Sequence, residues 1–266
     1  MFFNSSIEPI YFLLPLVGFI VGLGGSMLGG GGGFIFLPIL TLLFKVPPHI
    51  AVTTSLMATL PICIVGSWRH FQKGNVYLRI AITFALVGIL GALLGTCAIG
   101  LISSRILNLG FGIYSVLIAL NIIYSTLRGS EQDSNGNGNH RRGKKIGSKV
   151  KIVFFGFAAG TITGVLGTSA AAIVLAGLMN LRIPLKMIIG TSLVVVLNNT
   201  LFAVFAHFLV SKVDMTLVYF LTSGSILGAF IGPHLLTKSN ITKSDSLAKY
   251  AYAGVIAILG VIMIIK

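Results

Sequence analysis

The chain has 266 residues, 55% of them apolar and 9% charged, and its mean hydropathy is +1.00. A water-soluble domain of this size needs far more charge on its surface, so the composition predicts an all-α, multi-pass membrane protein. The formal net charge is +14, but the cations gather in one linker and at the ends of apolar segments. Membrane topology and anionic lipids account for that pattern, so we expect a lipid bilayer as a partner and no nucleic acid.

The first apolar stretch, residues 10–44, is too long for a single crossing. As one helix it would be about 52 Å long, whereas the hydrocarbon core of a bilayer is about 30 Å thick. It contains a run of consecutive glycines: Gly29, Gly30, Gly31, Gly32 and Gly33. Each glycine costs about 1 kcal/mol in a helix interior, so the run should break the helix. The short piece that follows, Phe34–Phe44, either crosses obliquely or forms a re-entrant hairpin with its predecessor.

We expect this glycine run to bind substrate. Its amides should lie at the N-terminus of the next helix, where unpaired N–H groups and the helix dipole suit an anion. Non-helical backbone survives in hydrocarbon only where protein or a water-filled cavity surrounds it, and doubled broken helices mark the substrate sites of transporters. The alternative is that the glycines only permit close helix packing, the role that we expect for Gly18, Gly22, Gly91 and Gly95.

The next apolar stretch, residues 50–68, offers polar candidates at Thr53, Thr54 and Ser55. These hydroxyls either bind substrate or bond the carbonyl groups of their own helix. Pro61 should kink the same helix and could act in gating.

After two further apolar stretches, 79–102 and 105–127, the sequence turns hydrophilic. Residues 128–151 are rich in Gly, Asn and Ser and end in cations, which predicts a flexible basic linker. It separates a first membrane repeat, 1–127, from a second, 152–266. The repeats align in register: Gly18, Gly22, Gly29, Thr54, Ser55 and His70 match Gly156, Gly160, Gly167, Thr191, Ser192 and His207. This similarity predicts an internal duplication with about eight to ten membrane-embedded helices.

The second repeat supplies the matched candidates. Its counterpart of the glycine run begins at Gly167 and contains Thr168 and Ser169. This copy either lines the site with hydroxyls or is a better-behaved helix with a scaffolding role. Further candidates are Thr191, Ser192 and Asn198, the last at the position matched to Pro61. His70 and His207 are either interfacial side chains near the membrane surface or proton-sensitive gates for a coupling proton.

The distribution of Lys and Arg predicts the orientation. With the N-terminus outside and an odd number of crossings in each repeat, only Lys45, Arg105, Lys212 and Lys266 lie outside. All other cations, including those of the linker, are then cytoplasmic, as the positive-inside rule requires. This favours inverted repeats, with parallel repeats as the alternative.

The acidic residues decide the class of substrate. They all fall in termini or loops: Glu8, Glu131, Asp133, Asp214 and Asp245. A cation transporter normally buries a carboxylate, so a cation substrate, a metal site and an enzyme site built on carboxylates are all disfavoured. We expect no enzyme activity, no metal and no cofactor. The groups left inside the spans are mostly hydrogen-bond donors, and they favour an anion.

Several motifs together resemble the sulfite exporter TauE/SafE family of membrane permeases. They are the doubled glycine-rich segment, the run from Pro47 to Ser55, the run from Ile183 to Ser192, and the GALLG and GAFIG elements. The resemblance implies transport of sulfur-containing anions across the cell membrane. The sequence departs from the family pattern at Thr168–Ala171 and Ala176, where a second glycine run and a proline are expected.

We therefore expect a secondary transporter for a small anion, such as sulfite or an organosulfonate. It should work by alternating access, with the site between the two repeats near the bilayer midplane. The alternative function is a membrane scaffold or assembly factor without transport activity. Oligomeric state does not follow from the sequence.

Overall fold

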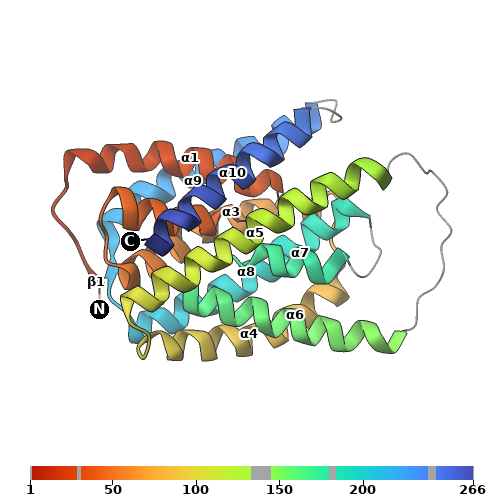
Figure 1. Cartoon of the computed structure of the whole chain (residues 1–266), viewed down its shortest axis with the longest axis horizontal. Helices are drawn as coiled ribbons and strands as arrows, with labels where there is room; N and C mark the ends of the chain where they lie inside the picture. The colour runs from red at the N-terminus through yellow and green to blue at the C-terminus, as the bar shows by residue number, and fades with distance from the viewer. Residues whose placement is uncertain (1, 29–30, 133–144, 180–183, 239–243, 266) are drawn as a thin grey trace.

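The computed structural model describes residues 2–28, 31–132, 145–179, 184–238 and 244–265 (Figure 1). Its helices are α1 (Leu14–Leu28), α2 (Gly33–Pro38), α3 (Pro48–Gln72), α4 (Leu78–Ile99), α5 (Ser104–Gln132), α6 (Lys145–Leu166), α7 (Ala171–Met179), α8 (Leu185–Val210), α9 (Met215–Lys238) and α10 (Ser244–Ile265). A 3-10 turn (Pro9–Leu13) precedes α1, and a π-helical turn (Ile39–Leu43) extends α2. The predicted helical class is confirmed.

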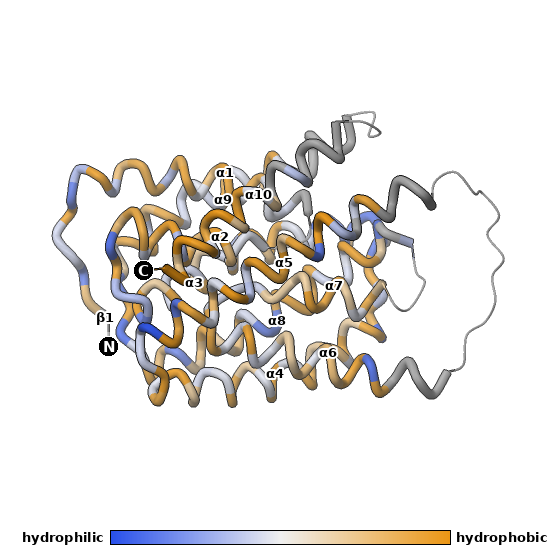
Figure 2. The backbone as a smooth tube through the Cα atoms, viewed as in Figure 1, coloured by the Kyte–Doolittle hydropathy of each residue, from blue (hydrophilic) through white to orange (hydrophobic). Residues whose placement is uncertain are grey.

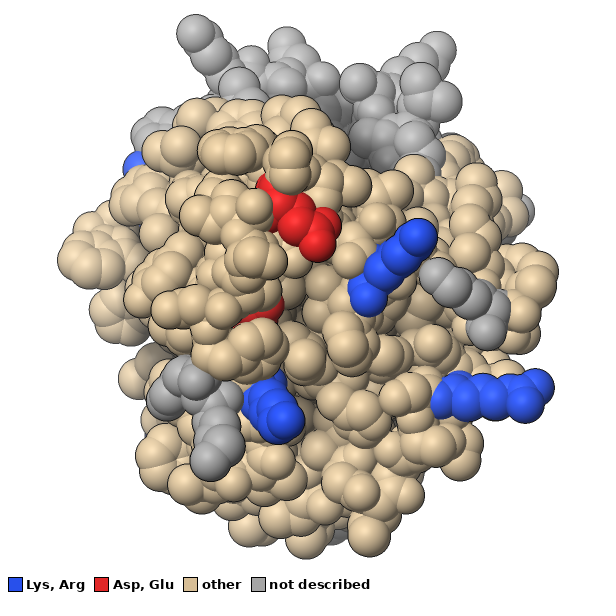
Figure 3. Space-filling view, turned by 90° about the vertical axis from the view of Figure 1, so that its left-hand side faces the viewer, with Lys and Arg blue, Asp and Glu red and all other residues tan. Residues whose placement is uncertain are grey.

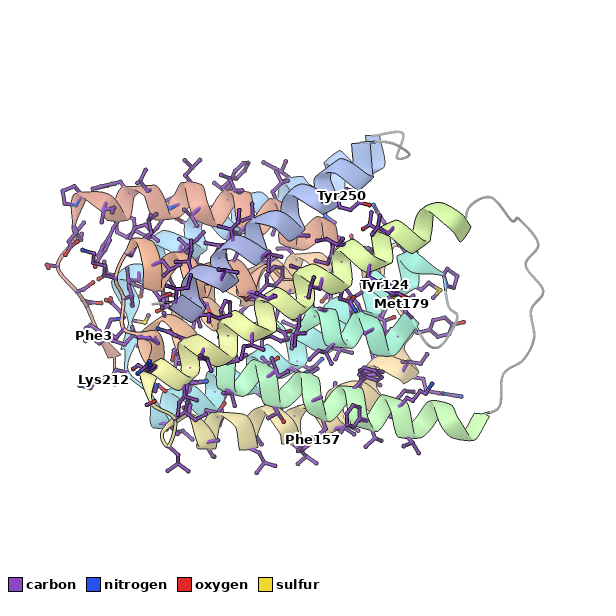
Figure 4. All side chains as sticks on the ribbon, in the orientation of Figure 1. Phe3, Tyr124, Phe157, Met179, Lys212 and Tyr250 are labelled. Carbon is purple, nitrogen blue, oxygen red and sulfur yellow. The ribbon has the colours of Figure 1, made fainter. Side chains whose placement is uncertain are left out.

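Two short strands, β1 (Phe2–Phe3) and β2 (Val213–Asp214), pair in parallel and attach the N-terminal segment to the loop between α8 and α9. The backbone N–H of Ser5 donates to Asp214 Oδ1 over 3.3 Å, and Thr216 Oγ1 donates to the Ser5 carbonyl over 3.1 Å. Phe3 and Lys212 therefore lie at the same end of the molecule (Figure 4).

Helix lengths and composition agree with a multi-pass membrane protein. Six segments are long and apolar enough to cross a membrane: Pro9–Ser26, Pro48–Gln72, Leu78–Ile99, Ser104–Tyr124, Lys186–Val210 and Met215–Gly232. Shorter apolar helices cover Gly33–Leu43, Val150–Leu166 and Ala253–Ile265. Apolar positions extend along the helices, and the most hydrophilic described positions lie mostly toward the two ends (Figure 2).

The helices pack in closely spaced pairs because small residues line their contacts. α1 packs on α9, and α4 packs on α6. A Cβ atom on Gly18 would lie 2.9 Å from the backbone nitrogen of Ser225 in α9, and one on Gly91 would lie 2.8 Å from that of Thr161 in α6. These glycines act in helix packing, as predicted.

Helices α3 and α8 form the centre of the bundle. They contact one another, α3 also packs on α9, and α8 also packs on α4. Helix α3 is buried on all sides over the consecutive residues Ala51 to Leu56. The pair α5 and α10 crosses one side of this centre (Figure 1).

Both chain ends lie at one end of the bundle. β1 and the C-terminal end of α10 are at the left of Figure 1, whereas α5 ends and α6 begins at the right. Few charged side chains are visible on the left-hand end (Figure 3). Residues 133–144 of the predicted linker 128–151 lie outside the described residues, as do Gly29 and Gly30, whereas 128–132 and 145–151 extend α5 and α6 as helix.

Candidate functional site

Two breaks in the helices face each other in the centre of the molecule. The first lies between α1 and α2 at Gly31 and Gly32, whose φ angles are +64° and +73°. The second lies between α6 and α7, at Gly167–Ala170. A Cβ atom on Gly33 would lie 3.0 Å from the Ser169 backbone nitrogen, and one on Gly31 would lie 3.3 Å from the Ser169 Cβ. The two turns are therefore in van der Waals contact.

The second turn is a true interruption of the helix. Gly167 has a φ of +63°, and Ala170, which is not a glycine, has a φ of +40°. An L-residue adopts that region at a cost of about 1–3 kcal/mol, so surrounding structure must hold it there. The expectation of a better-behaved helix at this position is therefore wrong. The sequence has only one glycine here, Gly167, which is too few to predict the break.

Helix α3 supplies one wall of the junction through three side chains, one helical turn apart. The Ser55 hydroxyl donates to the Gly167 carbonyl over 2.6 Å, and so satisfies a backbone group that the break leaves free. Thr59 Oγ1 would lie 2.8 Å from a Cβ on Gly33, and Cys63 Sγ would lie 2.9 Å from a Cβ on Gly31. Thr59 and Cys63 are both fully buried, and neither was a predicted candidate.

Tyr114 approaches the second turn from α5. Its hydroxyl lies next to the Thr168 side chain, yet it has no hydrogen-bond partner of good geometry among the described residues. The side chain is only 9% exposed. A buried phenol normally has a partner, so this hydroxyl is available to a ligand. Sequence reasoning missed it because a tyrosine in an apolar helix carries no distinctive local pattern.

We call these residues the central cluster. It consists of Gly31, Gly33, Ser55, Thr59, Cys63, Tyr114, Thr168 and Ser169. The structure thus brings together Gly31, Gly33, Ser55, Thr168 and Ser169 from the predicted site, whereas a Cβ on Gly32 would face Val21 of α1. Every side chain of the cluster is buried, so the described conformation is closed around it.

Thr191 lies elsewhere. Thr191 Oγ1 accepts a hydrogen bond from the Tyr77 backbone N–H over 2.9 Å, which ties α8 to the start of α4. Ser192 Oγ donates to the Ile189 carbonyl over 2.9 Å. The described contacts of Thr191 are thus with the loop between α3 and α4.

The remaining hydroxyls on α3 behave differently from one another. Thr53 Oγ1 donates to the His49 carbonyl over 3.3 Å, within its own helix. Thr54 is fully buried and its hydroxyl has no partner among the described residues. Thr54 therefore keeps an open donor, while Thr53 does not.

Two adjacent amides of α8 also differ. Asn198, the predicted candidate, donates from Nδ2 to the Val194 carbonyl over 2.8 Å, so its amide is used locally. Asn199 is fully buried with both amide atoms unpartnered among the described residues, and it packs against Gly88 of α4. A buried amide without partners is costly, which makes Asn199 a further candidate beside Asn198.

The predicted gating residues occupy unequal environments. His207 is fully buried, with Nε2 2.9 Å from the Gly164 carbonyl and Nδ1 3.1 Å from Ser211 Oγ. His207 is therefore buried within the protein in the last turn of α8. His70 is partly exposed and has a buried Nδ1 without a described partner, and Pro61 lies within the continuous helix α3.

The electrostatics of the central cluster come from dipoles and donors. No carboxylate side chain of the described residues belongs to it, and the described residues hold no group of three His, Cys, Asp or Glu that could bind a metal. The buried carboxylate of Asp214 is 3% exposed and lies at the end of the bundle, where it accepts from the Thr216 backbone N–H over 3.0 Å. Hydroxyls and backbone N–H groups at helix breaks are suited to hold a small anion.

Comparisons with known proteins agree with this chemistry. The sequence profile of the family described as Sulfite exporter TauE/SafE matches residues 14–263. The chain is 24% identical over 245 residues to "Probable membrane transporter protein YdhB" of Bacillus subtilis (strain 168), covering 89% of this chain and 97% of the relative. It is 31% identical over 230 residues to a "Probable membrane transporter protein" of Xylella fastidiosa (strain 9a5c), covering 86% and 84%. No solved structure matches the chain.

Proposed function

Because the chain belongs to the sulfite exporter TauE/SafE family, we propose that it is a secondary transporter for a small oxoanion. The substrate class is a sulfur-containing anion such as sulfite or an organosulfonate. It acts in the cell membrane, with a proton as the candidate coupling ion, and it needs no cofactor. The observation that carries the proposal is the meeting of two broken helices at the central cluster.

Two physical arguments connect this junction to an anion. A backbone N–H or C=O group left unpaired at membrane depth costs several kcal/mol unless protein or substrate bonds it. The presence of an interrupted helix in both halves therefore indicates that the interruptions have a function. The Tyr114 hydroxyl beside it is a donor without a partner of good geometry among the described residues, while the Thr59 hydroxyl already donates to the Ser55 carbonyl over 2.7 Å. An oxoanion presents only acceptors, whereas a cation would find no carboxylate among the described residues of the cluster.

Helix pairing supports the proposed internal repeats. In this pairing, α1 corresponds to α6, α3 to α8 and α4 to α9. The contact of α1 with α9 then corresponds to that of α6 with α4, and the contact of α3 with α9 corresponds to that of α8 with α4. The pairs α3 with α8 and α5 with α10 map onto themselves. Such a correspondence is expected of two repeats related by a two-fold axis. The apolar pairs α1–α2 and α6–α7 are then re-entrant hairpins that enter from opposite sides and meet at the midplane.

Alternating access requires the central cluster to open toward each side in turn. In the proposed cycle, one hairpin separates from α3 while the other stays in place. The scaffold alternative lacks a supporting observation, because a scaffold has no use for two interrupted helices that meet beside the unpartnered Tyr114 hydroxyl.

A flux assay in proteoliposomes tests the proposed substrate class. Sulfite, thiosulfate, sulfoacetate and taurine are compared with nitrate and with a neutral solute, using purified protein and empty vesicles as the control. We expect the sulfur oxoanions to be carried fastest. Faster movement of a cation or a neutral solute than of any oxoanion would contradict the proposal.

A further inference from the structure

A polar crevice lies at the end of the bundle that carries both termini, about 9 Å along α5 from Tyr114 of the central cluster. It is a cavity of about 360 Å³ between the first turn of α5 and the last turn of α10, with Pro48 of α3 at its edge. Its polar wall is formed by Ser104, Arg105 and Asn108 of α5. Met263 and Ile264 of α10 are part of the apolar wall.

The polar wall has unused binding capacity. Arg105 is exposed, and no carboxylate of the part of the chain that the structure describes forms an ion pair with it. The Oδ1 atom of Asn108 is buried but has no hydrogen-bond partner there. A ligand that satisfies both groups must carry a negative charge for Arg105 and a hydrogen-bond donor for Asn108.

The surroundings of the crevice are strongly apolar. Leu101 is 90% exposed, Ile106 is 60% exposed and Ile265 is 80% exposed, all around the same end of α5 and α10. Ile106 belongs to one candidate membrane span and Leu101 closely follows another, whereas Ile265 belongs to a shorter apolar helix. Acyl chains are the natural cover for such side chains in a bilayer, so a ligand here has an apolar part beside its anionic head.

From these observations we propose that the crevice binds the headgroup of a membrane phospholipid. The phosphodiester pairs with Arg105, and a hydroxyl or ammonium of the headgroup donates to Asn108 Oδ1. The acyl chains then lie along Leu101 and Ile106. Phosphatidylglycerol has the required charge and donors, whereas phosphatidylcholine has the phosphodiester but no donor.

Lipid retention by the purified protein tests this assignment. Native mass spectrometry measures the binding of phosphatidylglycerol, phosphatidylcholine and diacylglycerol to the full chain in detergent. Wild-type protein should prefer phosphatidylglycerol over phosphatidylcholine and both over diacylglycerol. Arg105→Gln should weaken phosphatidylglycerol binding about fivefold.

Two variants make the test specific. Arg79→Gln is the matched control, because Arg79 is likewise an exposed arginine at the second position of its helix, α4. It should bind phosphatidylglycerol as the wild type does. Asn108→Ala should remove the preference for phosphatidylglycerol over phosphatidylcholine.

Two results would overturn the proposal. One is equal phosphatidylglycerol binding by Arg105→Gln and the wild type, with both folded by thermal unfolding. The other is displacement of the lipid by millimolar inorganic phosphate, which would identify a free-anion site in place of a lipid site.

Discussion

At the scale of single residues, Tyr114 separates a binding role from a structural one. Its hydroxyl lies next to the Thr168 side chain but makes no hydrogen bond of good geometry with the described residues, so Tyr114→Phe should disturb the closed protein little. If the hydroxyl donates to the anion, the variant should bind substrate about tenfold more weakly, the equivalent of about 1.4 kcal/mol. The measurement is the concentration dependence of sulfite uptake.

Thermal unfolding of the same variant serves as its control. The Tyr114→Phe protein should unfold close to the wild-type temperature, because no hydrogen bond of good geometry with the described residues is lost. Unchanged half-saturation by sulfite in this stable variant would remove Tyr114 from the proposed site.

Ser55 shows the opposite behaviour, since its hydroxyl is committed to the protein. Ser55→Ala leaves the buried Gly167 carbonyl without its partner, which should cost about 1–3 kcal/mol of stability. Thr83→Ala is a suitable comparison, because the Thr83 hydroxyl bonds the Arg79 carbonyl on an exposed face. Circular dichroism melts should show a lower midpoint for Ser55→Ala only. Equal midpoints would mean that the bond to Gly167 does not hold the second turn.

At the scale of elements, the sequence predicted the helix break between α1 and α2 better than the one between α6 and α7. The run Gly29–Gly33 has too many glycines for a helix, and the helix does stop before Gly31 and restart at Gly33. The second break retains only Gly167 and places Ala170 at positive φ, a conformation that residue type alone does not predict. Tertiary contacts from Ser55 and Val52 to Gly167 hold this turn, and such contacts are invisible in a local pattern.

Packing glycines should respond to substitution differently from glycines of the central cluster. A Cβ on Gly91 would press against the Phe157 carbonyl and lie 2.8 Å from the Thr161 nitrogen, so Gly91→Leu should separate α4 from α6. We expect a large fall in the amount of folded, monodisperse protein in size-exclusion chromatography. Gly100→Leu at the end of α4 is the control, because nothing lies within 4 Å of its added Cβ. Equal recovery of both variants would refute the packing role.

At the scale of the whole molecule, composition alone predicted a helical, multi-pass membrane protein, and the six apolar spans agree. The matched residues of the two halves predicted equivalent positions but not their contacts. Thr54 and Thr191 align. The Thr54 hydroxyl has no described partner, whereas Thr191 Oγ1 accepts a hydrogen bond from the Tyr77 N–H just before α4. Under the proposed duplication, divergence of the two halves would account for a predicted site that meets only in part at the centre.

Orientation in the membrane remains a prediction from the distribution of Lys and Arg, and it can be measured directly. Asn4 and Lys73 are exposed and lie near β1 and the end of α3, respectively. Each is changed to cysteine in a background without Cys63 and Cys97. A membrane-impermeant maleimide should label Asn4→Cys in intact cells and label Lys73→Cys only after permeabilisation. Labelling of both positions in intact cells would exclude the inverted arrangement.

The central claim is that the junction of the two broken helices is the anion site, and sulfite uptake by Gly33→Ala tests it most directly. The added methyl would lie 2.8 Å from Thr59 Oγ1 and 3.0 Å from the Ser169 nitrogen, inside the proposed site. Gly24→Ala is the matched control. Gly24 lies in the nearby helix α1, and nothing lies within 4 Å of its added Cβ. In proteoliposomes with equal amounts of folded protein, we predict that Gly33→Ala loses sulfite uptake while Gly24→Ala retains it. Wild-type uptake by folded Gly33→Ala protein would contradict the claim.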